Sequence, residues 1–116
     1  MKVLSPRTHG ILDYVTVIAF LLAPALFGLS GLPATISYLL AVVHLVLTLV
    51  TAFPLGLVKA VSFKLHGVVE LVVSVLLVVL PWLLGFASVL TARTFYVGAG
   101  IVVFIVWLVT DYAGDV

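Results

Sequence analysis

The sequence predicts an all-α fold: a bundle of four transmembrane helices built from two parallel helical hairpins related by a pseudo-twofold axis. Three observations predict it, namely the composition, four long apolar stretches and an internal repeat. Hydrophobic residues make up 66% of the 116-residue chain and charged residues only 8%, whereas soluble domains carry about 25% charged residues. We therefore expect one integral membrane domain, residues 1–116, with the lipid bilayer as its main partner.

The composition also excludes several classes of protein. The chain has no cysteine, so disulfides, thiolate catalysis and sulfur-ligated metals are excluded. Its net charge is +1 and it has no basic patch, so nucleic acid is not an expected partner. The sequence contains neither a nucleophile elbow nor a phosphate-binding loop, which favours a non-enzymatic protein.

Four apolar stretches are separated by turns rich in glycine, proline or polar residues. The stretches are residues 10–27, 35–53, 67–84 and 94–109. At ~1.5 Å per residue each forms a helix of roughly 24–29 Å, close to the ~30 Å hydrocarbon core of a bilayer. Many of these residues are valine and isoleucine, but an open strand in lipid would leave its backbone unpaired, so helices are expected.

The first stretch carries two further signals. Lys2 and Arg7 precede it and an Ala-Pro-Ala tripeptide lies near its end at residues 23–25, which imitates a secretory signal peptide. We expect it to remain a helix of the protein, because the same segment recurs inside the chain. Pro24 and its counterpart Pro81 each free the carbonyl four residues earlier, so we expect a matched kink in the first and third helices.

An internal repeat relates residues 5–56 to residues 62–113. A shift of 57 positions matches the motif S-x-(R/K)-x-H-G-x-x-(D/E), followed by P-x-L-x-G, in the two halves. The matched pairs include Ser5 with Ser62, Arg7 with Lys64, His9 with His66, Gly10 with Gly67, Asp13 with Glu70 and Pro24 with Pro81. Each unit contains two spans, so the repeats are parallel and matched residues are expected at equal depth.

The same shift makes a prediction about the second helix of each hairpin. It matches Ser37 with Thr94 and Ala41 with Gly98. Each pair of small residues is spaced four apart, a pattern that lets membrane helices approach closely. We therefore expect close helix packing at these residues, and the sequence leaves open which helix faces meet.

Charged residues predict the orientation. Lys2, Arg7, Lys59 and Lys64 belong to the side that holds both chain ends, whereas the opposite side holds only Arg93. The positive-inside rule then predicts an inner (plasma) membrane protein with both termini in the cytoplasm. Near the C-terminus, we expect Asp111 and Asp115 to pair with Lys59 or Lys64.

The second repeat resembles a known family. The segment VVLPWLLGF (residues 78–86), followed by ARTFYVGAGIVVFIVWL (residues 92–108), is similar to the SPW-repeat membrane proteins. Their unit is two membrane helices with Ser-Pro-Trp late in the first. The corresponding tripeptide is Leu-Pro-Trp at residues 80–82 and Ala-Pro-Ala at residues 23–25. The resemblance implies paired membrane helices and no particular activity.

The polar residues of the repeat form two pairs with helical spacing, His9 with Asp13 and His66 with Glu70. We favour a local pair at the start of each helix, where the helix dipole also stabilises the carboxylate. The alternative brings both pairs together near the pseudo-twofold axis. His9, Asp13, His66 and Glu70 would then be candidate ligands for zinc or manganese, or the two histidines would hold a haem, with Gly10 and Gly67 leaving room for its faces.

His44 is predicted near the middle of the second span, with no histidine at the matching position. We favour a neutral side chain that bonds to a backbone carbonyl or a threonine hydroxyl of a neighbouring helix. As a titratable group at membrane depth it is also a functional candidate. It would then form part of a half-channel for protons or act as an axial haem ligand.

Three functions remain open on the sequence. The favoured one is a small membrane bundle of unknown biochemical activity that self-associates or joins a larger membrane complex. The first alternative is an electron-transfer protein that binds haem or metal through His9, His66 or His44. The second alternative is an oligomeric subunit for the transport of protons, ions or small solutes.

Overall fold

A computed structural model describes residues 2–114 and contains four long helices. They are α1 (Pro6–Leu26), α2 (Gly31–Leu49), α3 (Phe63–Leu83) and α4 (Leu90–Val109). Two short strands in the central loop, β1 (Thr51–Ala52) and β2 (Val61–Ser62), pair in parallel. All four helices are long and apolar enough to cross a membrane. The predicted all-α fold with four membrane-length helices is confirmed.

All four helices begin earlier than the apolar stretches indicate, and in α1 and α3 a serine caps the helix start. The hydroxyl of Ser5 accepts a hydrogen bond from the backbone N–H of Thr8 at 3.2 Å, and that of Ser62 accepts one from Leu65 at 3.1 Å. Such caps satisfy backbone donors that a helix start otherwise leaves unpaired. The first turns of α1 and α3 therefore include polar residues, and they carry His9 and His66 respectively.

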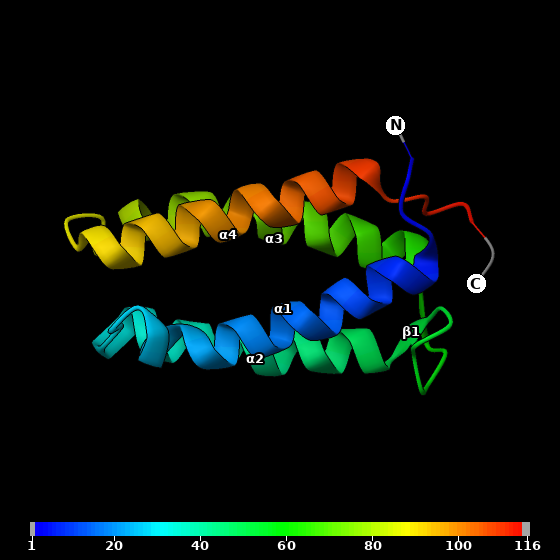
Figure 1. Ribbon diagram of the computed structural model, residues 1–116, viewed down its shortest axis with the longest axis horizontal. Helices are drawn as coiled ribbons and strands as arrows, with labels where there is room; N and C mark the ends of the chain where they lie inside the picture. The colour runs from blue at the N-terminus through cyan, green and yellow to red at the C-terminus, as the bar shows by residue number, and fades with distance from the viewer. Residues whose placement is uncertain (1, 115–116) are drawn as a thin grey trace.

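Figure 1 shows α1 running beside α2 and α3 beside α4 as two antiparallel hairpins. Both chain ends and β1 lie at one end of the bundle, and the two tight turns lie at the other. The molecule measures 43 × 27 × 21 Å, and its long axis matches the ~40–45 Å thickness of a bilayer with its headgroups. We call the end with the chain termini the terminal end.

The apolar core occupies the half of the bundle that is remote from the terminal end. Val17, Phe20, Leu77 and Tyr96 are among its buried members. The Ser37 hydroxyl donates to the Phe20 carbonyl at 2.7 Å, which is the acceptor that Pro24 deprives of its helical partner. The Tyr96 hydroxyl donates to the Pro33 carbonyl at 2.6 Å and so links the two hairpins.

The buried face of α4 is displaced by two residues from the positions that the shift of 57 matches to buried Ser37 and Ala41 of α2. Ala92, Tyr96 and Gly100 are its buried residues, whereas Thr94 and Gly98 are exposed. The reason is the turn between the helices. Residues 84–89 join α3 to α4, and they form a segment two residues longer than residues 27–30, which join α1 to α2.

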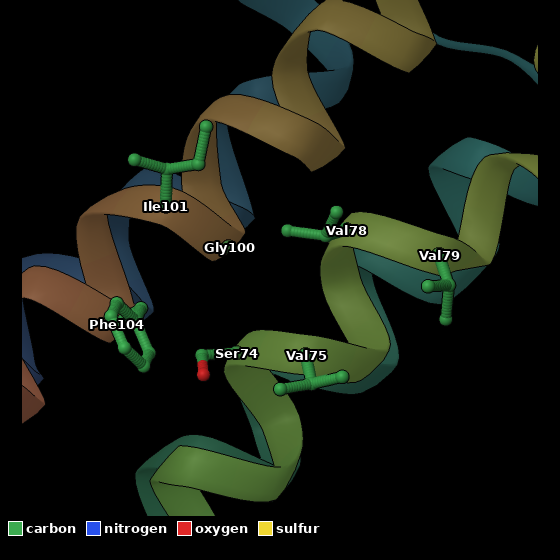
Figure 2. A pocket seen from close by; sticks show the side chains of 7 residues that line it. All are labelled: Ser74, Val75, Val78, Val79, Gly100, Ile101 and Phe104. Atoms are coloured by element: carbon green, nitrogen blue, oxygen red, sulfur yellow. The ribbon is translucent and has the colours of Figure 1, made fainter.

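Gly100 allows α4 to approach α3 closely, as Figure 2 shows. A Cβ at Gly100 would lie 2.7 Å from both the Ser74 carbonyl oxygen and the Val78 side chain, whereas a Cβ at Gly98 would meet nothing within 4 Å. We expect Gly100→Ala to destabilise the bundle by about 1–3 kcal/mol relative to Gly98→Ala, which gains the same helix propensity without the clash. Unfolding of the two variants in mixed micelles measures this difference, and equal stabilities would contradict the packing described.

Candidate functional site

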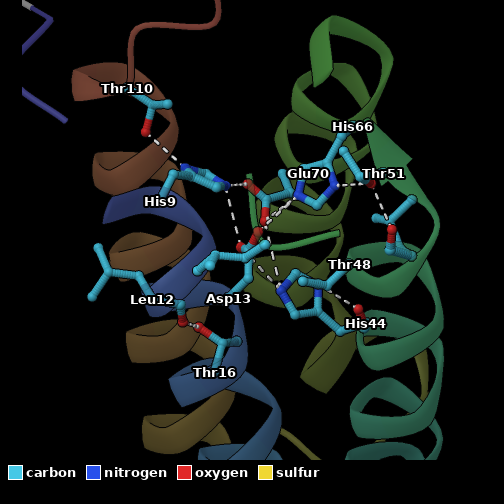
Figure 3. A network of polar contacts seen from close by, with 12 residues as sticks. His9, Leu12, Asp13, Thr16, His44, Thr48, Thr51, His66, Glu70 and Thr110 are labelled. Carbon is cyan, nitrogen blue, oxygen red and sulfur yellow. Dashed lines mark hydrogen bonds and ion pairs between the residues drawn. The ribbon is translucent and has the colours of Figure 1, made fainter. Parts of the chain in front are cut away.

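The histidines and acids that the sequence predicts as two local pairs lie in one buried cluster near the terminal end (Figure 3). His9 and Asp13 come from α1, and His66 and Glu70 come from α3. Both histidines are 0% exposed and both acids 3%. One ligand atom from each residue lies within 4.8 Å of the other three. The polar first turns of α1 and α3 therefore face each other across the bundle.

Each histidine contacts both carboxylates. His9 Nε2 lies 2.8 Å from Glu70 Oε2 and 3.2 Å from Asp13 Oδ1. His66 Nε2 lies 3.1 Å from Asp13 Oδ2 and 3.2 Å from Glu70 Oε1. Both local pairs of our favoured interpretation are therefore present, but they do not stand alone, because contacts between the hairpins are as short as those within each helix. The structure brings together the four residues of the alternative set.

Each imidazole contacts a threonine hydroxyl through Nδ1, the ring nitrogen that faces away from the carboxylates. His9 Nδ1 lies 2.8 Å from the Thr110 hydroxyl, and His66 Nδ1 lies 2.8 Å from the Thr51 hydroxyl. Each hydroxyl also donates to the carbonyl four residues earlier, Thr110 to Val106 at 2.6 Å and Thr51 to Leu47 at 2.5 Å. Since the hydroxyl proton is used there, the oxygen accepts from Nδ1–H. In the neutral imidazole, Nε2 then directs a lone pair into the cluster.

The separations within the cluster are those of ligands around a common centre. Although carboxylate oxygens lie close by, His9 Nε2, His66 Nε2 and Asp13 Oδ2 have no hydrogen-bond partner with acceptable geometry. Ligands about 2.0–2.2 Å from a zinc ion lie roughly 2.9–3.5 Å from one another in tetrahedral or octahedral geometry. The four nitrogen–oxygen separations of 2.8–3.2 Å, which involve both oxygens of each carboxylate, are close to this range.

A second layer of side chains holds the carboxylates. His44 Nε2 lies 3.3 Å from Asp13 Oδ1 in a hydrogen bond, and the Tyr112 hydroxyl donates to Glu70 Oε2 at 3.3 Å. Burial, aided by the charge of Glu70, raises the pKa of Tyr112 well above its usual range. Tyr112 therefore stays protonated and remains a donor. Each acid thus receives one side-chain contact from the second half of its own hairpin.

The predicted environment of His44 is wrong. Its ring contacts Asp13, whereas the hydroxyl of Thr48 bonds to the backbone carbonyl of His44 at 2.7 Å. Because α2 ends at Leu49 instead of residue 53, His44 lies near the helix end, level with the cluster. Sequence reasoning also did not connect Thr51, Thr110 and Tyr112 with the histidines. Thr51 and Thr110 are 59 positions apart, so the shift of 57 does not match them.

Aromatic rings occupy the faces beside both glycines. A Cβ at Gly10 would lie 2.6 Å from the Phe53 ring, and one at Gly67 would lie 2.7 Å from the Tyr112 ring. The cavities that border His44 and Glu70 have volumes of only about 40 and 20 Å³. A drug-sized ligand needs ~300 Å³ or more, so the space beside His44 and Glu70 fits nothing larger than an ion or a water molecule. The histidines of the cluster have no room for the haem that the sequence left open.

The ion pairs among the described residues all join a histidine to Asp13 or Glu70. Asp111, which we expected to pair with a lysine, accepts a hydrogen bond from the Ala113 backbone at 3.1 Å. Lys59 donates to the carbonyls of Phe53 and Gly56 in the central loop. Asp115, for which the same pairing was predicted, lies outside the described residues.

No family model, curated protein or solved structure matches this chain. The likeness to SPW-repeat proteins therefore depends on the quoted sequence segments, and any function has to be argued from the cluster itself.

Proposed function

We propose that this chain is an integral membrane protein that binds one divalent transition-metal ion on His9, Asp13, His66 and Glu70. The observation that carries the proposal is the pair of Nε2 atoms that face carboxylate oxygens without a hydrogen-bond partner. Lone pairs and negatively charged oxygens repel each other at such distances. A cation bound between them replaces this repulsion with coordination bonds. Without metal, protons on the imidazoles would remove the repulsion instead.

Charge balance supports a single divalent ion. Asp13 and Glu70 contribute two negative charges, the neutral imidazoles contribute none, and both acids are 3% exposed. One divalent cation therefore makes the buried set neutral, which reduces the cost of placing charges in an apolar bundle. Mixed imidazole and carboxylate ligands suit zinc, manganese or ferrous iron, whereas magnesium and calcium favour all-oxygen sites.

The ligand set also supports a structural role for the ion. Four protein ligands and little free volume are typical of closed sites, since catalytic zinc keeps a position open for water. The ligands come in equal number from α1 and α3, so a bound ion would join the two hairpins. If the ion is redox-active, such as iron or manganese, the same site would support electron transfer.

The test is metal analysis of detergent-purified protein. Protein stripped with a chelator is given Zn²⁺, Mn²⁺, Fe²⁺ or Mg²⁺ in turn, and tightly bound metal is counted after gel filtration. We expect about one transition-metal ion per chain, little Mg²⁺, and loss of the ion in the His9→Ala/His66→Ala double variant. Failure to retain any of these ions would contradict the proposal, as would equal retention of Mg²⁺.

His44 and Tyr112 are expected to support the site without being essential to it. Each positions a carboxylate ligand, and loss of such an outer contact weakens metal affinity by about 10–100-fold. His44→Ala and Tyr112→Phe should therefore still bind one ion per chain with dissociation constants raised by that factor. Competition with a chromophoric chelator measures the shift, and unchanged affinity in both variants would exclude the positioning role.

We further propose that the fold arose by duplication of a hairpin and that both chain ends face the cytoplasm. Matched contacts support the duplication, since His9 meets Thr110 as His66 meets Thr51. The orientation is supported by the basic residues of the chain start, the central loop and the first turn of α3. It would place the protein in a prokaryotic-type inner membrane. Kinship with the SPW-repeat proteins is proposed on the same helix-pair pattern.

Self-association is the second candidate function, and the register of α4 supports it. Thr94 and Gly98 are exposed and line an apolar groove of about 430 Å³ between α1 and α4. Small residues four apart on a lipid-facing surface let a helix of another copy approach closely. Replacement of Gly98 by isoleucine should then dissociate the oligomer in cross-linking and analytical ultracentrifugation. An unchanged oligomeric state would show that this groove is not the interface.

A further inference from the structure

A cavity of about 330 Å³ opens at the terminal end of the α3–α4 hairpin. We call it the basic pocket, and its polar and aromatic lining residues are Lys2, Lys64, Trp107, Asp111 and Tyr112. Two ammonium groups and one carboxylate give it a net positive charge. Lys2 Nζ donates to the Leu108 carbonyl at 3.3 Å and lies 5.9 Å from the centre of the Trp107 ring. Basic and aromatic residues together at a helix end are typical of the headgroup level of a membrane.

An apolar groove of about 280 Å³ lies on the same pair of helices, further from the terminal end. Val75, Ile101 and Phe104 are among its lining residues, and Figure 2 shows them around the gap between α3 and α4. The Phe104 ring lies 5.7 Å from the ring of Trp107, which lines the basic pocket. On α3, Val68 of the pocket and Val75 of the groove are seven residues apart, so they share one helix face. The pocket and the groove therefore follow each other along one lipid-facing surface.

We propose that this surface is a binding site for one anionic glycerophospholipid. The phosphate would lie in the basic pocket beside Lys2 and Lys64, and one acyl chain would follow the groove past Phe104 to Val75. The net positive charge of the pocket complements a headgroup with one negative charge, such as phosphatidylglycerol. The groove supplies the apolar surface that a soluble phosphate compound would not use.

The first hairpin has different side chains at the corresponding place and so provides internal controls. At Gly10, the counterpart of Gly67, a Cβ would meet the side chains of both Phe53 and Leu55, the latter at 3.0 Å. The central loop thus fills the corresponding place. Arg7 is the counterpart of Lys64, and Ile18 is the counterpart of Val75; both Val75 and Ile18 are exposed on the lipid-facing surface.

The test is native mass spectrometry of the full chain released from detergent with added phosphatidylglycerol or phosphatidylcholine. We expect one retained phosphatidylglycerol and weaker retention of phosphatidylcholine. Lys64→Ala should weaken retention about fivefold, the effect of one basic contact at a membrane surface. Val75→Trp, which fills the groove from the lipid side, should reduce retention further. The matched variants Arg7→Ala and Ile18→Trp should retain the lipid as the unmodified protein does.

Two outcomes would overturn the proposal. Equal losses in Lys64→Ala and Arg7→Ala, or in Val75→Trp and Ile18→Trp, would indicate nonspecific lipid association. Full competition by soluble glycerol phosphate, with no effect of Val75→Trp, would indicate a site for free phosphate compounds. All four variants lie outside the cluster, so an unchanged circular-dichroism spectrum confirms that each one has folded.

Discussion

His9→Ala is expected to weaken divalent metal binding by more than about 100-fold, beyond the 10–100-fold typical of outer contacts. His66→Ala should have an equal effect, because the two imidazoles have matching environments. Each is fully buried, each is held by a threonine at 2.8 Å, and each approaches both carboxylates. The dissociation constant is measured by chelator competition on detergent-purified protein.

The matched control for this prediction is His44→Ala, which removes a histidine from the same cluster. His44 is farther from Glu70, at 3.6 Å, and forms a hydrogen bond with Asp13. His44→Ala should therefore weaken metal affinity less than His9→Ala or His66→Ala does. If all three alanine variants lose affinity equally, the division into ligands and an outer residue is wrong.

Glu70→Ala is expected to destabilise the metal-free protein by about 3–5 kcal/mol, the usual cost of removing one partner from a buried ionic group. Glu70 lies within 3.2 Å of both His9 and His66 and accepts the hydrogen bond of Tyr112. Without Glu70, the side chains of His9, His66 and Tyr112 stay buried, and Asp13 is the one carboxylate left in the cluster. The free energy of unfolding in mixed micelles, measured in the presence of a chelator, tests this value.

Two further variants make the result specific. Glu70→Gln keeps an acceptor for Tyr112 and the shape of the side chain, so it should destabilise the protein less than Glu70→Ala. Asp111→Asn keeps the acceptor for the Ala113 backbone outside the cluster, and a change of this kind costs within about 0.5 kcal/mol. A loss below 1 kcal/mol in Glu70→Ala would mean that the cluster contributes little to joining the hairpins.

The four helices could be predicted from the sequence because their number follows from the length and apolarity of the stretches. Their starts were misjudged at Ser5 and Ser62, since hydropathy does not count a polar capped turn as part of a span. The end of α2 was misjudged in the opposite direction, because the predicted span was too long. Residues 51–52 are apolar enough to extend the helix, but they pair with residues 61–62 instead.

The composition of the cluster could be predicted, whereas its convergence could not. The repeat pointed to His9, Asp13, His66 and Glu70, but helix spacing alone does not say which faces meet across a bundle. That depends on how the two hairpins pack against each other. The longer turn at residues 84–89 also shifts α4 by two residues. The same shift separates Thr51 and Thr110 in the sequence comparison, although they contact the two histidines in the same way.

X-ray absorption spectroscopy of the Zn²⁺- or Co²⁺-loaded protein tests the central claim most directly, because it reads the atoms bound to the ion. The account predicts two imidazole nitrogens and two carboxylate oxygens at about 2.0–2.2 Å. It also predicts loss of one imidazole in His9→Ala and in His66→Ala, with both imidazoles kept in His44→Ala. A spectrum with solvent oxygens alone, or one unchanged in His9→Ala, would contradict it.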